Sequence, residues 1–426
     1  MQDLLNIWSE WIKPSAGLAT VQWSVLLALA AAAGHLVQRY TGLPKVIGYS
    51  VVGALAGFAG FTGALWPLEG IGLFLLELGV AVVLFEAGGR ISLRWFRHNP
   101  MVLVQSLLES GLTLMTVYWA MKYMGVRDAV AQPLAMLAMA ASPAVLARVL
   151  IDTRASGPVS ERAMVLSTLS TLYALLLCSA AAGMMGKGDK ILGPITISTS
   201  FYPVLVVLGL SVVVGGVLAL VLRMALRVMS PTSENTAILL LAVIAAGAAL
   251  AAHFGGSAAL AALLGGMLLK QLNPRPWSWP RQMGTASSML TMLMFVLVSV
   301  VAAQADWGGP VAALVAVLIV VRVLAKIVGT AIGNVGSGAS WRQALWVGCA
   351  MSPLSSIALL LVSGFISAEP NLGKQIAMIA LPAILLMEVF GAVLATLAIT
   401  RTGESSRPPK LQLQPIHSPS SQRGDL

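Results

Sequence analysis

Long apolar runs recur from about residue 17 to residue 400, and they constrain the fold more than any other feature of the chain. A helix needs about 20 mostly apolar residues to cross a bilayer, whereas a membrane β-barrel is built from short strands of alternating character. The runs here are long and unbroken, so we predict an all-α polytopic membrane protein with about thirteen transmembrane helices. The predicted segments are 17–38, 46–63, 70–89, 100–121, 129–151, 163–186, 198–222, 235–252, 255–269, 284–304, 309–331, 343–366 and 375–400.

The scarcity of charged residues supports this class. Only 10% of the 426 residues are charged and 58% are hydrophobic, whereas roughly 25% of residues are charged in soluble domains. Such a chain cannot cover a water-facing surface of ordinary size, so a soluble multi-domain enzyme is excluded. In a soluble protein the net charge of +10 would suggest binding to nucleic acid. Here the positions of the basic residues along the chain suggest another explanation.

The basic residues are distributed unevenly between the two alternating sets of loops. Of the 26 Lys and Arg residues, eighteen fall on one side, six fall on the other, and Arg322 and Lys326 fall inside a segment. Basic residues accumulate in cytoplasmic loops. The bias predicts an outside N-terminus, a cytoplasmic C-terminus and a multi-pass protein of the cell's inner (plasma) membrane. It also accounts for the net charge without a nucleic-acid partner.

Three regions follow from the segment pattern. Residues 1–16 form an N-terminal interfacial segment, either a short helix or a polar lead-in whose Trp side chains lie at the headgroup level. Residues 17–400 form the transmembrane domain. Residues 401–426 are rich in Ser, Pro, Gln and Arg and are predicted to be a disordered cytoplasmic tail.

Two predicted segments contain a Ser-Pro pair near their middle. Ser142-Pro143 lies within 129–151, and Ser352-Pro353 lies within 343–366. Proline removes a helical hydrogen bond, and in lipid the freed carbonyls need other partners. The two segments are seven apart in order and therefore run in opposite directions. An inverted-topology repeat has this arrangement, with the binding site between two broken helices. The alternative is a pair of ordinary proline kinks.

A few charged residues fall inside the predicted segments, where each costs at least about 2.5–3.5 kcal/mol on insertion scales. Arg322 and Lys326 are four residues apart and share one helix face, so they need negative neighbours such as a carboxylate or the C-terminal ends of half-helices. The functional reading is an ion or proton path, and the structural one is a buried pair that fixes helix packing. The acidic candidates for a proton path are Glu77, Glu109 and Glu388.

Signatures of enzymes are missing from the sequence. It has no HExxH zinc motif, no GxSxG nucleophile motif and no Walker loop. Cys178 and Cys349 lie inside apolar runs and have no metal-ligand spacing. We therefore expect neither enzymatic activity nor a cofactor, and no metal beyond a transported cation.

Several stretches, taken in order, resemble the bacterial monovalent cation:proton antiporters of the Kef and sodium/proton exchanger type. The similarity runs over about residues 22–404. It is carried by TGLPKVIGYSVVGALAGFAG (41–60), LLELGVAVVLFEAGGRISLRWFR (75–97), MAASPAVLARVLIDTRASGP (139–158), AALAALLGGMLLKQL (258–272), RVLAKIVG (322–329) and MEVFGAVLATLAITRTGE (387–404).

The resemblance implies two inverted repeats with crossed discontinuous helices, and a core domain that moves against a dimerising scaffold. It implies a homodimer in the lipid bilayer that exchanges a monovalent cation for a proton. Arg322 and Lys326 are similar to the family's basic positions on that segment. Glu77 and Glu388 are similar to positions where relatives also carry Glu.

One departure from the family falls on the segment after the first broken helix. Relatives carry an aspartate there that binds the cation and the proton in turn, whereas this chain places Ser170 or Thr171 at that position. A hydroxyl can ligate a cation but cannot exchange a proton near neutral pH. The candidate ion ligands are therefore the hydroxyls of Ser142, Ser170, Thr171, Ser352 and Ser355, and the proton carrier would be Glu388, Glu109, Glu77 or Lys326.

Three hypotheses follow. The chain is a Na⁺ or K⁺:proton antiporter that works by alternating access with a modified ion site. Alternatively, Arg322 and Lys326, without the aspartate, make the site selective for anions. In the third hypothesis the chain is a transport-inactive homologue that acts as a membrane partner or scaffold.

Overall fold

The computed structural model describes residues 18–61, 64, 66–91, 93–185, 197–229, 233–273, 281–305 and 307–406. Over these residues the regular structure is helical, apart from one isolated antiparallel bridge between Ala155 and Ser405. The predicted all-α membrane architecture is confirmed. Ten of the described helical spans are long and apolar enough to cross a bilayer, and three further apolar helices are shorter.

Each predicted segment coincides with a helix or with a pair of half-helices, and their ends differ by a few residues. The N-terminal half contains α2 (Leu18–Thr41), α3 (Lys45–Phe58), α4 (Gly70–Gly89), α5 (Leu93–His98), α6 (Pro100–Tyr123), α7 (Asp128–Met139), α8 (Pro143–Thr153) and α9 (Pro158–Met185). The C-terminal half contains α10 (Ile197–Val228), α11 (Glu234–His253), α12 (Ala258–Leu272), α13 (Arg281–Ala303), α14 (Gly309–Ile332), α15 (Trp341–Ala350), α16 (Ser356–Ala368) and α17 (Pro370–Arg401). The short α5 was not predicted.

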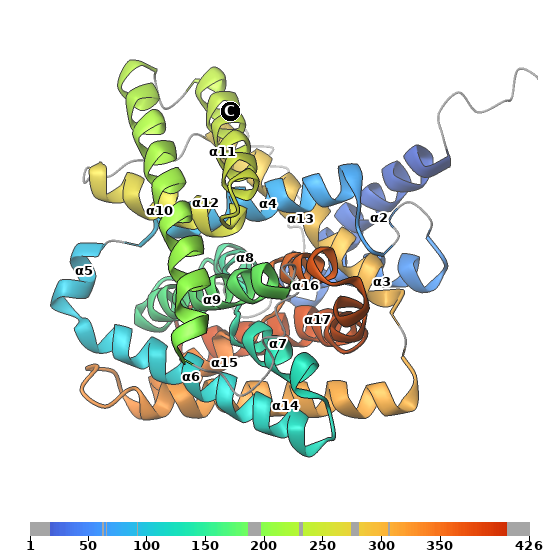
Figure 1. Cartoon of the computed structure of the whole chain (residues 1–426). Helices are drawn as coiled ribbons and strands as arrows, with labels where there is room; N and C mark the ends of the chain where they lie inside the picture. The colour runs from blue at the N-terminus through green and yellow to red at the C-terminus, as the bar shows by residue number, and fades with distance from the viewer. Residues whose placement is uncertain are drawn as a thin grey trace, which may run out of the picture.

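The helices form two bundles (Figure 1). One, here called the scaffold bundle, consists of α2–α4 and α10–α13, and its pairs α4–α12 and α3–α13 pack closely. The other, the core bundle, consists of α6–α9 and α14–α17, with α6 and α14 side by side along its outer edge. The bundles meet where α17 contacts α3 and α13, and where α9 contacts α10.

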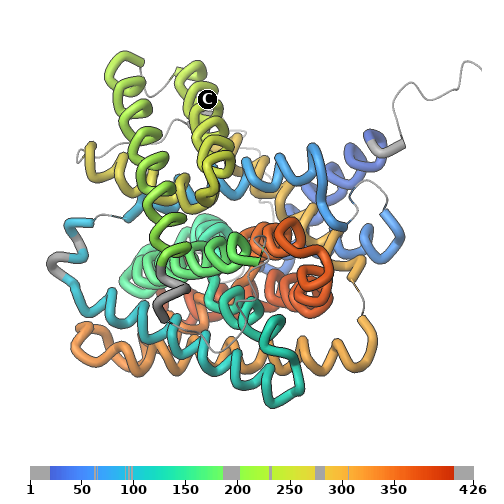
Figure 2. Tube along the Cα trace, in the orientation of Figure 1, coloured from blue at the N-terminus to red at the C-terminus, as the bar shows by residue number. Residues whose placement is uncertain are grey.

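The two Ser-Pro segments are broken helices, as predicted. In the first, α7 ends at Met139 and α8 begins at Pro143, with Ser142 as the N-cap residue. In the second, α15 ends at Ala350 and α16 begins only at Ser356. Figure 2 shows α8, α9, α16 and α17 together in the middle of the molecule, so segments from the two halves of the chain share the centre.

The predicted terminal regions fall partly outside the described residues. Residues 1–16 and 407–426 lie outside them. Residues 402–406, which the sequence assigned to the tail, are described and dock on the start of α9. The Glu404 carboxylate accepts hydrogen bonds from the backbone N–H groups of Val159 and Ser160, both at 2.8 Å. An acidic group at a helix N-terminus compensates the unpaired N–H groups and the helix dipole.

Candidate functional site

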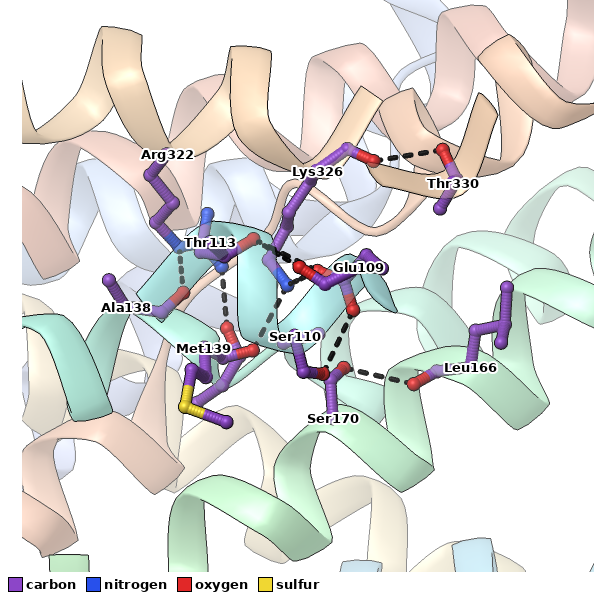
Figure 3. Close-up of polar contacts among 12 residues, drawn as sticks. Glu109, Ser110, Thr113, Ala138, Met139, Leu166, Ser170, Arg322, Lys326 and Thr330 are labelled. Carbon is purple, nitrogen blue, oxygen red and sulfur yellow. Dashed lines mark hydrogen bonds and ion pairs between the residues drawn. The ribbon is translucent and has the colours of Figure 1, made fainter. Parts of the chain in front are cut away.

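A buried ion pair joins α6 and α14. The Lys326 Nζ lies 2.6 Å from the Glu109 Oε1, and both side chains are fully buried. Thr113 and Ser110 also donate to the Glu109 carboxylate, at 3.3 and 3.1 Å. Figure 3 shows this group facing the end of α7. The carboxylate supplies the negative neighbour that the sequence required for one of the two basic residues.

Arg322 obtains its negative neighbours from the backbone of both broken helices. Its guanidinium donates to the carbonyls of Ala138 and Ala140 at the end of α7, at 3.0 and 2.6 Å, and to those of Ser352 and Pro353 in the second break. Lys326 donates to the Met139 carbonyl between them, at 3.0 Å. The last carbonyls of a helix lack intrahelical partners and carry partial negative charge. Arg322 therefore joins the two breaks, and Lys326 adds a contact to the first.

A glycine allows α14 to approach α6 closely enough for this ion pair. Arg322, Lys326 and Gly329 follow one another at helical spacing and share one face. A Cβ at Gly329 would lie 2.7 Å from the Glu109 Cα, closer than side-chain carbons approach backbone. We call Glu109, Arg322 and Lys326 the paired cluster.

A second polar group surrounds Glu388 on α17. Its Oε1 accepts hydrogen bonds from Ser50 on α3 at 2.6 Å and from Ser299 on α13 at 3.4 Å, and its Oε2 accepts one from Ser355 in the second break at 3.1 Å. All four side chains are buried. We call these residues the Glu388 cluster. It contains one carboxylate and three hydroxyls, which are oxygen ligands suited to hard cations.

Close packing of α17 on the second break positions this carboxylate. Gly391 lies one turn after Glu388, and a Cβ there would lie 2.6 Å from the Pro353 Cα. The break itself offers a free hydroxyl because Ser355, the N-cap residue of α16, makes no side-chain capping bond. In the first break, by contrast, the Ser142 hydroxyl caps its own helix by accepting from the Val145 N–H at 3.3 Å.

Three carboxylates are buried in the described part of the chain, and they differ in charge compensation. Glu109 pairs with Lys326. Asp152 lies 3.6 Å from the Arg148 Nε and accepts the Lys45 backbone N–H at 2.9 Å. Glu388 has no basic side chain within 4.0 Å among the described residues. It is therefore the buried carboxylate whose charge is left uncompensated.

The remaining predicted ligands are dispersed. Ser170 donates to the Leu166 carbonyl of its own helix at 2.9 Å, pointing along α9 (Figure 3). Thr171 donates to the Ser167 carbonyl of its own helix at 2.7 Å and to the Ala141 carbonyl in the first break at 3.0 Å, which links α9 to that break. The Ser352 hydroxyl is buried and has no hydrogen-bond partner among the described residues. Only Ser355 of the five predicted ligands contacts a carboxylate.

Glu77, a predicted proton-path residue, stands apart from both clusters. It lies on α4 in the scaffold bundle and is partly buried. The structure gives its carboxylate no hydrogen bond or ion pair among the described residues. Of the five predicted charged residues, Glu109, Arg322 and Lys326 lie together in the paired cluster. Glu388 is the one charged residue of its own cluster, and Glu77 belongs to neither.

Sequence reasoning missed Ser50 and Ser299. Each is a single hydroxyl in an apolar run, IGYSVVG and VLVSVVA, and serine in a membrane helix is common. Nothing in either run identifies a partner 338 or 89 residues away. The only available signal was that an isolated buried carboxylate needs hydrogen-bond donors, and the sequence did not say from which helices they come.

Comparisons with known proteins agree with this architecture. The family model described as the transmembrane part of sodium/hydrogen exchangers matches residues 25–400. The structure resembles that of the sodium proton antiporter MjNhaP1 from Methanocaldococcus jannaschii at pH 8, with a TM-score of 0.67 and 15% identity over 90% of this chain and 98% of that one. An electron-microscopy structure of the same antiporter matches with a TM-score of 0.65 and 15% identity, over 93% of this chain and 100% of that one. No curated protein matches the chain at a significant level.

Proposed function

Because the chain belongs to the sodium/hydrogen exchanger family, we propose that it exchanges Na⁺ or K⁺ for protons at a modified site whose carrier group is Glu388. The proton and the cation bind the same carboxylate in turn, and the core bundle moves against the scaffold bundle to expose it alternately to the two sides. The protein works in the plasma membrane as a homodimer, with its N-terminus outside and its C-terminus in the cytoplasm.

The observation that carries this proposal is the uncompensated charge of Glu388. A buried carboxylate without a cationic partner is costly when ionised, so a proton or a bound cation neutralises it. The Ser355 hydroxyl, which lies on the same bundle as Glu388, provides a further oxygen atom for an alkali cation, because a hydroxyl that turns its proton away presents a lone pair. The paired cluster cannot serve in this way without breaking the Lys326–Glu109 bridge.

The same charges argue against an anion carrier. That hypothesis needs buried cations that are free to bind a substrate. Lys326 is neutralised by Glu109, and Arg322 is occupied by four backbone carbonyls. An anion would have to displace these partners, so the geometry favours a cation.

Reconstituted protein tests the proposal. In liposomes with an internal pH dye, an inward Na⁺ or K⁺ gradient should drive proton movement with the wild type and fail to do so with Glu388→Gln. Glu86→Gln is the matched control, since Glu86 forms a local ion pair with Arg90 at 2.7 Å and belongs to neither cluster. Exchange that survives in Glu388→Gln would exclude this carrier. A wild type that responds to no alkali cation over a broad pH range would point to the transport-inactive homologue.

A further inference from the structure

We propose that Ser50 and Ser299 clamp the unloaded, ionised Glu388 to the scaffold bundle, so that the core bundle moves only when a proton or a cation occupies the carboxylate. The inference rests on the proposed function for its transport consequence. In this role the two scaffold hydroxyls make exchange obligatory, and they act as positioning residues.

The two oxygens of Glu388 are divided between the two bundles. Oε1 accepts from Ser50 on α3 at 2.6 Å and from Ser299 on α13 at 3.4 Å, and both helices belong to the scaffold bundle. Oε2 accepts from Ser355 at 3.1 Å, and that residue belongs to the core bundle together with Glu388 itself. Movement of the core bundle therefore breaks the bonds at Oε1 and can leave the bond at Oε2 intact.

The strength of the two scaffold bonds depends on the charge of the carboxylate. A hydrogen bond to an ionised acceptor is roughly twice as strong as one between neutral groups. A proton on Oε1 competes directly for the position that the serine hydroxyls occupy. A bound cation at the carboxylate partly neutralises its charge and repels the hydroxyl protons of Ser50 and Ser299, so their bonds to Oε1 weaken. Either ligand therefore loosens the contact between the bundles, while the empty anion tightens it.

Among the described residues, two other charged side chains of the core bundle contact the scaffold bundle. Asp152 accepts the Lys45 backbone N–H at 2.9 Å, and Arg148 donates to Ser288 on α13 at 3.2 Å, but neither is bonded to Glu388, so loading of that carboxylate leaves them unchanged. α17 is packed against α3, α7, α8, α13, α14, α15 and α16. The charged groups on these helices are engaged elsewhere or lie near helix ends. They are Lys45 on α3, Asp128 on α7, Arg148 and Asp152 on α8, Arg281 at the start of α13, Arg322 and Lys326 on α14, and Arg342 on α15, and Tyr49 on α3 is the titratable phenol.

A matched set of serine variants tests the clamp through transport. Ser50→Ala/Ser299→Ala removes both scaffold donors, and Ser355→Ala removes the core donor to the same carboxylate. Liposomes are loaded with radioactive Na⁺ or Rb⁺ and diluted into alkali-cation-free medium at alkaline pH, so that few protons are available to load Glu388. The clamp predicts that the double scaffold variant raises this uncoupled efflux at least tenfold over the wild type, because the unloaded core can return. Ser355→Ala should weaken cation affinity without raising the leak.

Hydrogen–deuterium exchange supplies a readout that does not require transport. In detergent or nanodiscs, Ser50→Ala/Ser299→Ala should speed amide exchange in α3 and α17 severalfold, and Glu388→Gln should do the same because it removes the charge. Ser355→Ala should leave α3 unchanged. Equal leak and equal exchange in the scaffold and core variants would overturn the clamp. If the wild type moves no cation, the proposed function fails. The rate of amide hydrogen exchange in α3 then still decides whether the clamp exists.

Discussion

Glu109 and Glu388 are both fully buried glutamates on core helices, and both accept hydrogen bonds from hydroxyl groups. They differ in one partner. Glu109 lies 2.6 Å from a lysine ammonium, whereas Glu388 has only serine hydroxyls. A carboxylate that is neutralised by a fixed cation has a structural role, because protonating it would leave the buried lysine ammonium without a negative partner. A carboxylate held by neutral donors can exchange its positive partner, and that is what an antiporter site requires.

The two helix breaks differ in a similar way, in the partners of their serine hydroxyls. In the first break, Ser142 uses its hydroxyl to cap α8, and the hydroxyl of Thr171 fixes α9 to the Ala141 carbonyl. In the second break, Ser355 leaves its helix uncapped and donates to Glu388. The serine of the first break thus bonds within its own helix, whereas Ser355 of the second break bonds to Glu388. The carrier that we propose therefore lies beside the second break and not beside the first.

The largest expected effect comes from Glu109→Gln. The substitution leaves the Lys326 ammonium buried without a charged partner, and breaking a buried pair in this way costs about 3–5 kcal/mol. Thermal unfolding in detergent should show a large drop in the melting temperature. Glu109→Gln/Lys326→Met, which removes both charges at similar volume, should recover most of it. A stable single variant would mean that the pair does not compensate charge.

Arg322→Lys is expected to have the next largest effect. Lysine keeps the charge but lacks the planar fork that reaches carbonyls of both breaks at once. Losing about two of the four hydrogen bonds should cost about 2–3 kcal/mol. The melting temperature measures the loss, and limited proteolysis near residues 140 and 352 should show that both breaks loosen. An unchanged melting temperature would show that a point charge alone suffices there.

Glu388→Gln should be nearly neutral for stability, although it is the same chemical change as at Glu109. The amide keeps an oxygen that accepts the serine hydroxyls, and no cation is stranded, so we expect a cost of about 1 kcal/mol or less. Melting curves of the two Gln variants, recorded side by side, test the contrast directly. A destabilisation at Glu388 as large as that at Glu109 would indicate a structural anion and remove the distinction between the clusters.

A similarly small effect is expected for Thr171→Val. The change keeps the shape of the side chain and removes the hydrogen bond to the Ala141 carbonyl, which should cost about 1 kcal/mol. Ser170→Ala serves as the control, because that hydroxyl bonds only within α9 and its loss should cost less. Melting temperatures that fall in the order wild type, Ser170→Ala, Thr171→Val would support this role of Thr171. The reverse order would assign the interhelical contact to Ser170.

Much of the fold could be predicted from the chain. The apolar runs located the helices, and Ser142-Pro143 and Ser352-Pro353 located the two breaks. Proline alone does not decide a break, since Pro133, Pro203 and Pro382 lie inside helices that continue. The spacing of Arg322 and Lys326 placed both on one face. The short helix α5 and the docking of Glu404 on α9 were not predicted, because each depends on contacts outside its own segment.

The candidate site divided differently between sequence and structure. The sequence showed which charged residues lie inside membrane segments and which of them share a helix face, because the faces of a helix follow from its own sequence. It could not say that Lys326 meets Glu109 across 217 residues of chain, or that Ser50 and Ser299 meet at one oxygen of Glu388. Side-chain pairing is decided by how helices cross, and here glycines at 329 and 391 permit the close approach.

The sequence by itself determined that this protein is a helical membrane protein with two broken helices and a few buried charges, because lipid forces every backbone polar group to be satisfied locally or at a break. Only the tertiary structure decided which of those charges is compensated. Compensation depends on distances of a few ångströms between helices remote in the chain, and those distances separate Glu109, which is paired, from Glu388, which is not.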